Sequence, residues 1–309
     1  DTDISVIFRT PDGEGRESDD AYLAIPTSGL GKEYYVMSYN PVRIGLGSNA
    51  SFFAIVAVED NTNVYFGMTN ILLDRGETFQ KISGTDLTGT FIRADKPIAV
   101  ISGSGGSFIP PTVFANDNLL EEMLPVEIWG MDYYTAPLYS PESGDQVRII
   151  ASENETVIDI DDGVNISEFT LPLAGAWIEL EIEPAVHITS KNPIFVVQYA
   201  RGKNSAGAGD PFEMGIIPTD GFDTRYIFYT PPGYTEGNFV TIIVPIDETI
   251  VTLDGSVIQS GWYPLPGGGK YIIAPVSVGE HVINADNPVG AYAHGYRNFG
   301  SYGYPAGFC

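Results

Sequence analysis

The chain has 309 residues, of which 43 % are hydrophobic, and it carries 40 acidic against 15 basic side chains. The hydrophobic fraction predicts a globular rather than a disordered protein, and the formal net charge of −25 argues against nucleic-acid binding, which needs a basic surface. No apolar run reaches the roughly 18 residues of a membrane-spanning helix, so we expect no membrane insertion. The many Gly (35), Pro (22), Tyr (18) and Phe (16) residues indicate an all-β fold of short strands joined by tight turns.

The chain opens with an apolar segment, Ile4–Phe8, that predicts a strand. It precedes a step from an apolar residue to proline that is followed by an aromatic strand. This step recurs at intervals of about 95 residues. Its three copies are Ile25-Pro26 before Tyr34, Leu124-Pro125 before Tyr133, and Ile217-Pro218 before Tyr226.

Two further patterns recur in the same order within each interval. The first is an apolar strand that leads through an acidic turn into a second strand, and the second is a proline that opens an apolar strand, where its missing N–H is tolerated. The acidic turns are Glu59–Thr62, Glu153–Thr156 and Asp247–Thr249, and the prolines are Pro97, Pro193 and Pro288. Three patterns that keep register across the chain predict an internal repeat.

We therefore predict an all-β protein of three tandem β-sandwich-like modules, packed together with pseudo-threefold repetition. The predicted units are residues 1–24 as an N-terminal strand and lead-in, 25–123 as module 1, 124–216 as module 2 and 217–309 as module 3. The N-terminal strand either opens module 1 or pairs with module 3 and closes the body, and its donation to a second molecule would build polymers. Helix is expected for at most one turn, near Asn118–Met123, and Ser102–Ser107 is expected to be a glycine-rich loop between modules.

Clustered carboxylates make calcium the one cofactor to consider. Asp159, Asp161 and Asp162 lie close together, and Asp60 stands in the first acidic turn. Hard oxygen ligands of this kind suit calcium, although neither segment matches an EF-hand loop. The alternative is that these side chains only shape their turns by accepting backbone hydrogen bonds.

Other candidate sites are covalent. Three Asn-X-Ser/Thr sequons predict glycosylation at Asn49, Asn154 and Asn165. The single cysteine, Cys309, is interpreted either as an interchain disulfide or as lying at the boundary of a longer protein. The histidines His187, His281 and His294 show no spacing that fits a zinc site, and the first two occupy matching strand positions in modules 2 and 3.

Several segments resemble the N-terminal domain of the IgGFc-binding protein family. They are Phe53–Val64, Ile92–Gly103, Leu124-Pro125, Trp129-Gly130 and Ser301–Gly307. The resemblance covers essentially the whole chain and carries over no catalytic residue. It implies an extracellular protein of mucus, matrix or cell-coat type, secreted with its signal peptide already removed, and in this family the domain often precedes von Willebrand type D modules.

The resulting prediction is a secreted, non-enzymatic structural or adhesive module that contacts other extracellular proteins or glycoproteins and assembles with itself into polymers. The C-terminal tyrosines either form part of the contact face or pack internally; they are Tyr292, Tyr296, Tyr302 and Tyr304. The alternative function is a glycan-binding module, and its candidate aromatic residues are Trp262, Tyr263, Tyr229 and Tyr234. No nucleophile motif or acid/base pair in a recognisable cleft context supports an enzyme.

Overall fold

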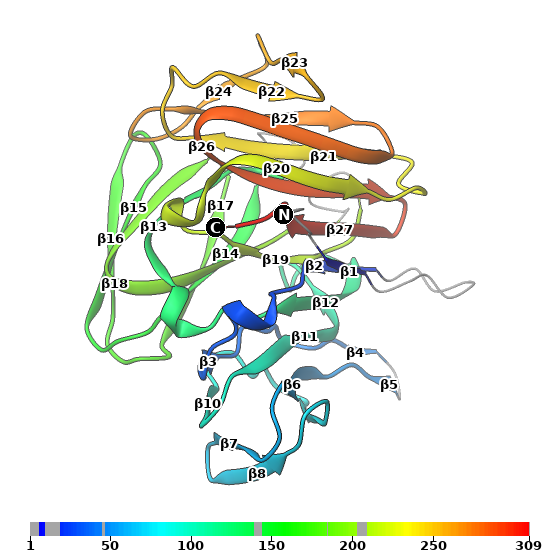
Figure 1. Cartoon of the computed structure of the whole chain (residues 1–309), viewed down its shortest axis with the longest axis vertical. Helices are drawn as coiled ribbons and strands as arrows, with labels where there is room; N and C mark the ends of the chain where they lie inside the picture. The colour runs from blue at the N-terminus through cyan, green and yellow to red at the C-terminus, as the bar shows by residue number, and fades with distance from the viewer. Residues whose placement is uncertain are drawn as a thin grey trace.

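The computed structural model describes residues 6–9, 19–44, 47–138, 144–183, 185–202 and 209–308, and it is an all-β protein, as the sequence predicts (Figure 1). Within these residues, no helix is long and apolar enough to cross a membrane. The helical segments described are single 3-10 turns, each directly after one of the repeated prolines. They are η1 (Thr27–Gly29), η2 (Val126–Ile128) and η3 (Thr219–Gly221), which follow Pro26, Pro125 and Pro218.

Two four-stranded sheets face each other in the first third of the chain. One has the order β3 (Glu33–Tyr35), β10 (Phe91–Ala94), β7 (Thr62–Phe66) and β8 (Thr69–Leu73); the other has the order β12 (Asn116–Glu122), β11 (Ile98–Phe108), β6 (Ser51–Ala57) and β9 (Thr78–Ser83). Successive residues of β6 alternate between buried and half-buried, because alternate side chains point to opposite faces. The ring of Phe66 lies 5.4 Å from that of Phe53 and 5.2 Å from that of Phe79, so aromatic side chains fill the space between the sheets as in a β-sandwich.

The chain after β12 forms two larger sheets, drawn green and yellow to red in Figure 1. We call the two four-stranded sheets together the first region, the seven-stranded sheet the second region and the eight-stranded sheet the third region. The seven-stranded sheet contains β16 (Ile166–Leu171), β15 (Thr156–Asp161), β18 (Val186–Tyr199), β14 (Asp145–Ala151) and β17 (Trp177–Ile182), with β13 (Gly130–Thr135) and β19 (Glu213–Ile216) paired to β18. The eight-stranded sheet contains β23 (Ser256–Val257), β22 (Val251–Leu253), β26 (Gly279–Arg297), β21 (Gly237–Val244), β25 (Lys270–Val276) and β24 (Tyr263–Pro264), with β20 (Asp223–Thr230) and β27 (Gly300–Pro305) paired to β26. Two small hairpins remain, β1 (Ile7–Arg9) with β2 (Ala21–Leu23) and β4 (Arg43–Ile44) with β5 (Gly47–Ser48).

Two long strands, β18 and β26, change partners along their length. The first half of β18 pairs with β13 and β15, and its second half pairs with β14 and β19. Pro193 and Pro288 therefore lie inside these strands, at the change of partners, and the prediction that they open a strand is wrong. The register of the neighbouring strands β13 and β20 shifts at the same place, which accommodates a residue that cannot donate to the ladder.

One local arrangement occurs three times. The hydroxyl groups of Tyr34, Tyr133 and Tyr226 each donate to a backbone carbonyl oxygen at 2.6 Å. The acceptors are Ile98, Ile194 and Val289, the residues directly after Pro97, Pro193 and Pro288. The sheets around these bonds differ in strand number and order. The division into three modules at residues 25, 124 and 217 accordingly stays a prediction.

Two sequence predictions about the first region are wrong. Asn118–Met123 is not helical, since β12 extends through Glu122 and pairs with β11. Ser102–Ser107 is not a loop, since it lies within β11 between β6 and β12. Its small residues are needed because the strands approach closely: a Cβ on Gly103 would lie 1.8 Å from the carbonyl oxygen of Leu119.

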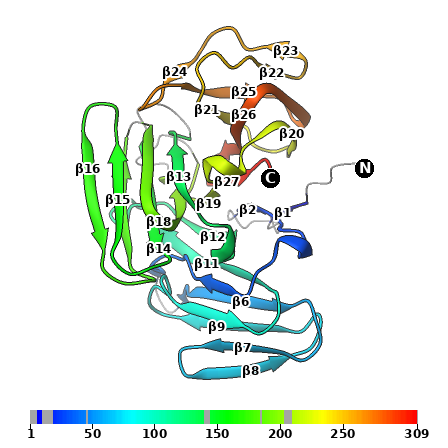
Figure 2. The same cartoon turned by 60° about the vertical axis from the view of Figure 1, so that its left-hand side comes forward.

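The sheets lie against one another (Figure 2), and their buried side chains form shared cores. One buried apolar cluster extends from Ile25 to Tyr296 and includes residues of the first, second and third sheet regions. A second cluster fills the third region and also contains Ala21 of β2, with Ile7 of β1 packed against it. In its described residues β1 pairs with β2. Of the two alternatives for the N-terminal strand, pairing with module 3 is not seen in these residues, and β1 contacts the third region through side-chain packing.

Candidate functional site

Two of the predicted calcium ligands shape the turn between β15 and β16. Asp161 Oδ1 accepts the Gly163 N–H at 2.8 Å. Asp162 Oδ1 accepts the N–H groups of Asn165 at 2.7 Å and Val164 at 2.8 Å. These backbone amides hold the pKa of Asp162 below its usual value, because they stabilise the ionised form.

The other two predicted ligands lie apart from each other. Asp60 Oδ1 accepts the N–H of Arg75 at 3.1 Å, and Asp159 is half-buried on β15. In the described part of the chain, no three His, Cys, Asp or Glu side chains gather closely enough to hold a metal ion. Turn formation accounts for three of the four carboxylates, and calcium binding stays a prediction.

The candidate sites for glycosylation and for a disulfide differ in exposure. Asn154 and Asn165 are exposed, whereas Asn49 is half-buried and its amide nitrogen lies 3.4 Å from the Asn116 side-chain oxygen. Glycosylation stays a prediction at all three asparagines. Cys309 lies outside the described residues.

Each histidine has a partner within the fold. His187 Nε2 lies 3.1 Å from Asp132 Oδ2, and His281 Nδ1 lies 2.7 Å from Asp254 Oδ2. His294 is fully buried, and burial lowers its pKa to about 3, so it is neutral at physiological pH. These contacts match the interpretation of the histidines as strand residues.

The predicted aromatic surfaces are mostly buried. All four C-terminal tyrosines, Tyr292, Tyr296, Tyr302 and Tyr304, are at most 2 % exposed. The hypothesis that they form a contact face is wrong, because β26 and β27 turn them into the core. Of the glycan-binding candidates, Tyr234 is also buried, and Trp262 is half-buried with its indole N–H donating to the Ile258 carbonyl oxygen. Tyr229 and Tyr263 are exposed but lie on different strands, β20 and β24.

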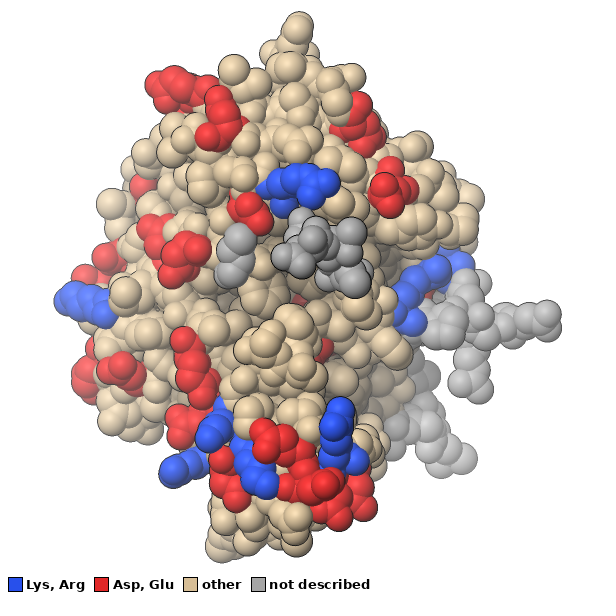
Figure 3. Space-filling view, in the orientation of Figure 1, with Lys and Arg blue, Asp and Glu red and all other residues tan. Residues whose placement is uncertain are grey.

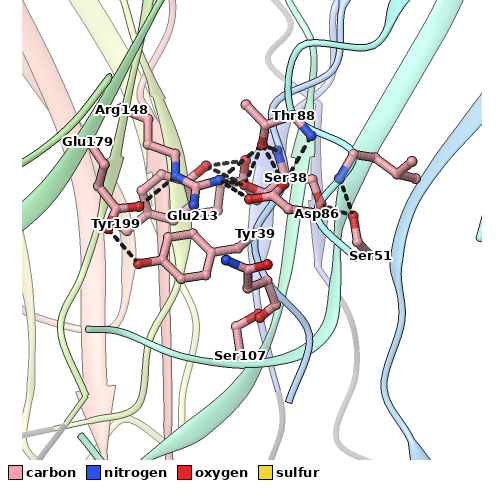
Figure 4. Close-up of polar contacts among 12 residues, drawn as sticks. Ser38, Tyr39, Ser51, Asp86, Thr88, Ser107, Arg148, Glu179, Tyr199 and Glu213 are labelled. Atoms are coloured by element: carbon pink, nitrogen blue, oxygen red, sulfur yellow. Dashed lines mark hydrogen bonds and ion pairs between the residues drawn. The ribbon is translucent and has the colours of Figure 1, made fainter. Parts of the chain in front are cut away.

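A buried arginine joins the first and second sheet regions (Figure 4). Arg148 of β14 donates through Nε to Glu179 Oε2 at 2.7 Å and through Nη1 to Asp86 Oδ2 at 2.8 Å. Nη1 also donates to the backbone oxygen of Ser38 at 2.5 Å and to Thr88 Oγ1 at 3.0 Å. The charge is therefore paired and hydrogen-bonded, as a buried charge must be.

Aromatic rings surround the same guanidinium group. The Cζ atom of Arg148 lies 4.0 Å from the ring centre of Tyr39, 4.4 Å from that of Trp177 and 5.7 Å from that of Tyr199. The guanidinium group is thus enclosed on its polar and aromatic sides, while the carboxylates of Asp86 and Glu179 stay half-buried. Sequence reasoning missed it, although a basic residue within the otherwise apolar stretch 147–151 of β14 was the available signal.

The exposed face of the sheet β3-β10-β7-β8 is different in character. Tyr65 stands opposite Arg93 in the ladder, and Phe91 and Leu72 lie on the same face by strand alternation. Tyr65 is 46 % exposed, Leu72 59 % and Phe91 39 %, and Met68 at the hairpin tip is fully exposed. In Figure 3 side chains of both charges gather over this lower part of the molecule. The face combines the residue types that are enriched in protein interfaces.

The family described as IgGFc binding protein matches residues 20–295. A human protein named IgGFc-binding protein is 24 % identical to this chain, and the similarity covers 88 % of this chain and 5 % of that protein. Among solved structures, a Pleurotus ostreatus lectin is 11 % identical with a TM-score of 0.17, and the similarity covers 59 % of this chain and 74 % of the lectin. A Streptomyces avermitilis α-L-rhamnosidase is 10 % identical with a TM-score of 0.22, covering 94 % of this chain and 39 % of the enzyme. Neither TM-score supports an argument.

Proposed function

This chain belongs to the IgGFc-binding protein family, and from that membership we propose that it is an extracellular module that binds other proteins through its surface and has no enzymatic role. The chain spans 5 % of the length of its human relative. The named family is not an enzyme family. The proposed biological role is structural or adhesive, in mucus, matrix or a cell coat.

One observation carries the proposal: the exposed face of the sheet β3-β10-β7-β8. Tyr65, Phe91 and Leu72 present apolar side chains on the outer face of the sandwich. Beside them lies an exposed ion pair between Arg93 Nε and Glu33 Oε1, at 3.6 Å. Surfaces of this composition bury well against a partner because aromatic side chains bring a large area at little cost in side-chain entropy. The partner that fits is a folded protein with an apolar patch beside a carboxylate that joins Glu33 at the exposed guanidinium group of Arg93.

Self-assembly is the second part of the proposal. A second copy of an acidic chain supplies such carboxylates, and the formal net charge of −25 makes the association depend on salt. Light scattering over a concentration series measures it directly. Assemblies that dissolve in chelator would assign a role to calcium, and assemblies that dissolve only in reductant would assign one to Cys309.

Binding is tested with two probes, immobilised immunoglobulin Fc and the chain itself. We expect one of them to bind, and we expect Tyr65→Ser to weaken that binding about tenfold or more. Tyr229→Ser is the matched control, because Tyr229 is equally exposed (49 %) but lies on β20 in the third region. The proposal would be contradicted if the chain stayed monomeric and did not bind Fc, or if both variants lost the same amount of binding affinity.

A further inference from the structure

Four buried carboxyl groups meet where β2 lies against β12, and β12 lies against β19. They belong to Asp20, Glu121, Glu122 and Glu213, and none is more than 7 % exposed. We call this group the carboxyl joint. It connects the N-terminal hairpin, the first sheet region and the second sheet region (Figure 1).

The carboxyl groups replace a backbone ladder between these strands. Strand β12 pairs with β11 and β19 pairs with β18, each through backbone hydrogen bonds. Between β12 and β19, by contrast, Glu121 Oε2 accepts the Gly215 N–H at 2.6 Å. Glu122 Oε2 accepts the Ile25 N–H at 3.1 Å, which fixes the chain just after β2.

Asp20 completes the connection from the N-terminal side. Its Oδ2 atom accepts the N–H of Leu120 in β12 at 2.8 Å and that of Glu213 in β19 at 3.2 Å. The carboxyl of Glu213 accepts the hydroxyl of Tyr199 at 3.3 Å through Oε1. Its Oε2 atom is buried with no hydrogen-bond partner among the described residues, so no donor would stabilise negative charge on this oxygen if Glu213 ionised.

Little positive charge balances this cluster. Among the described residues, no Lys, Arg or His makes an ion pair with Glu121, Glu122 or Glu213. The other ionisable groups that act on the cluster are Tyr22 of β2, Tyr34 of β3, Tyr199 of β18, Arg148 of β14 and Asp86. Burial raises the pKa of Tyr22 to about 12 and also that of Tyr199, so both stay neutral. Arg148 favours the ionised form of Glu213, but burial and the nearby Glu121 oppose it more strongly.

The carboxyl groups consequently hold their protons at an unusual pH. Burial raises the pKa of Glu121 to about 8 and that of Glu122 to about 7, against the lowering effect of their backbone hydrogen bonds. Burial also raises the pKa of Asp20 and of Glu213 well above the usual range, and the charges of neighbouring carboxylates add to this.

We propose that the carboxyl joint is a proton-controlled connection, which holds β2, β12 and β19 together while its groups are protonated and loosens as they ionise. Groups with a raised folded-state pKa contribute stability that is complete below their ordinary pKa of 4.5 and is lost as the pH rises through about 7 to about 8. The joint is thus closed in acid and open at mildly alkaline pH. This inference does not depend on the proposed binding function.

Hydrogen exchange read by mass spectrometry tests it on the intact chain. After correction for the intrinsic pH dependence of exchange, we expect the protection of β12 and β19 to fall about tenfold or more between pH about 6 and about 8. We expect β21, which lies in the third region, to keep its protection. In Glu121→Gln, which keeps an oxygen for Gly215 but cannot ionise, the loss in β12 and β19 should be much smaller.

Asp145→Asn is the matched control variant. Asp145 is also buried, with its pKa raised to about 7 by burial, but it bonds to Leu138 and Gln198 within the second region. This variant should leave the pH dependence at β12 and β19 unchanged. Equal effects of the two substitutions, or pH-independent protection in the native chain, would overturn the proposal. If Glu121→Gln does not fold, carbon NMR of the glutamate carboxyl groups decides in the native chain: titration of Glu121 near 4.5 would overturn it.

Discussion

At the scale of single residues, Arg148 shows how a buried charge can hold two sheet regions together. Its bonds to Asp86 and Ser38 reach the first region, and its bond to Glu179 stays in the second. An ion pair of this kind contributes mainly through what its loss would leave behind, since two carboxylates would remain without their cation.

Replacing Arg148 with Met should destabilise the fold by about 3–5 kcal/mol, because Asp86 and Glu179 would lose their partner in a largely buried setting. Urea denaturation measures this difference. The control is Arg93→Met, which removes the ion pair with Glu33 between two exposed side chains, and should cost about 1 kcal/mol or less. Similar costs for the two variants would show that the Arg148 network stabilises no more than a surface pair does.

The sequence predicted the chemistry of individual residues unevenly. The prediction that Tyr34, Tyr133 and Tyr226 lie on strands is confirmed, since aromatic side chains favour sheets. The C-terminal tyrosines were expected either outside or inside, because Gly-rich alternation such as Ser301–Gly307 has no polar face to indicate direction. The partners of Arg148 could not be predicted, since Asp86 and Ser38 lie 62 and 110 residues away in the chain.

At the scale of strands, β12 shows why a local pattern can mislead. The segment Asn118–Met123 contains good helix formers, Leu and Glu, and was predicted as a helical turn. In the structure Asp117, Leu119 and Glu121 face inward while Asn118 and Leu120 are half-buried, which is the period of two of a strand. Pairing with β11 overrides the local preference.

This alternation gives a direct test. Leu119→Ala should cost about 2–5 kcal/mol, because Leu119 is fully buried and its truncation leaves a cavity. Leu120→Ala should cost clearly less, because Leu120 is only half-buried. Thermal melting of the two variants compares them. A helical segment with both residues on one buried side would instead give similar losses.

The prolines Pro97, Pro193 and Pro288 differ in their places within strands. A proline after a charged or amide residue was interpreted as a strand start, and for Pro97 this agrees with β11 beginning at Ile98. In β18 and β26 the chain continues through the proline because the strand changes partners there. Such a long strand cannot be predicted from a local pattern, since its continuity depends on which sheets lie on either side.

At the scale of the whole molecule, buried acids and surface charge act in the same direction. Ionisation of the carboxyl joint places charge in the core, and the formal net charge of −25 adds repulsion between surface carboxylates. The all-β class followed from composition and turn residues, but the buried acids did not. Acidic residues are usually exposed, so nothing in the sequence distinguished Glu121 and Glu213 from the other acidic residues.

The free energy of unfolding should therefore be highest in mild acid and fall by on the order of a few kcal/mol between pH about 5 and about 8. The sign follows because the folded chain binds more protons than the unfolded chain over this interval, given pKa values raised by burial to about 7 for Glu122 and to about 8 for Glu121. Urea denaturation at a series of pH values at constant salt measures the profile. Stability that rises over the same interval would contradict it.

The two long strands also bear on how the molecule carries load. Because β18 and β26 each run through two sets of partners, a pulling force applied along either strand is distributed over ladders on both sides of its proline. Loss of one ladder leaves the other in place, so each half of a long strand is held by partners of its own.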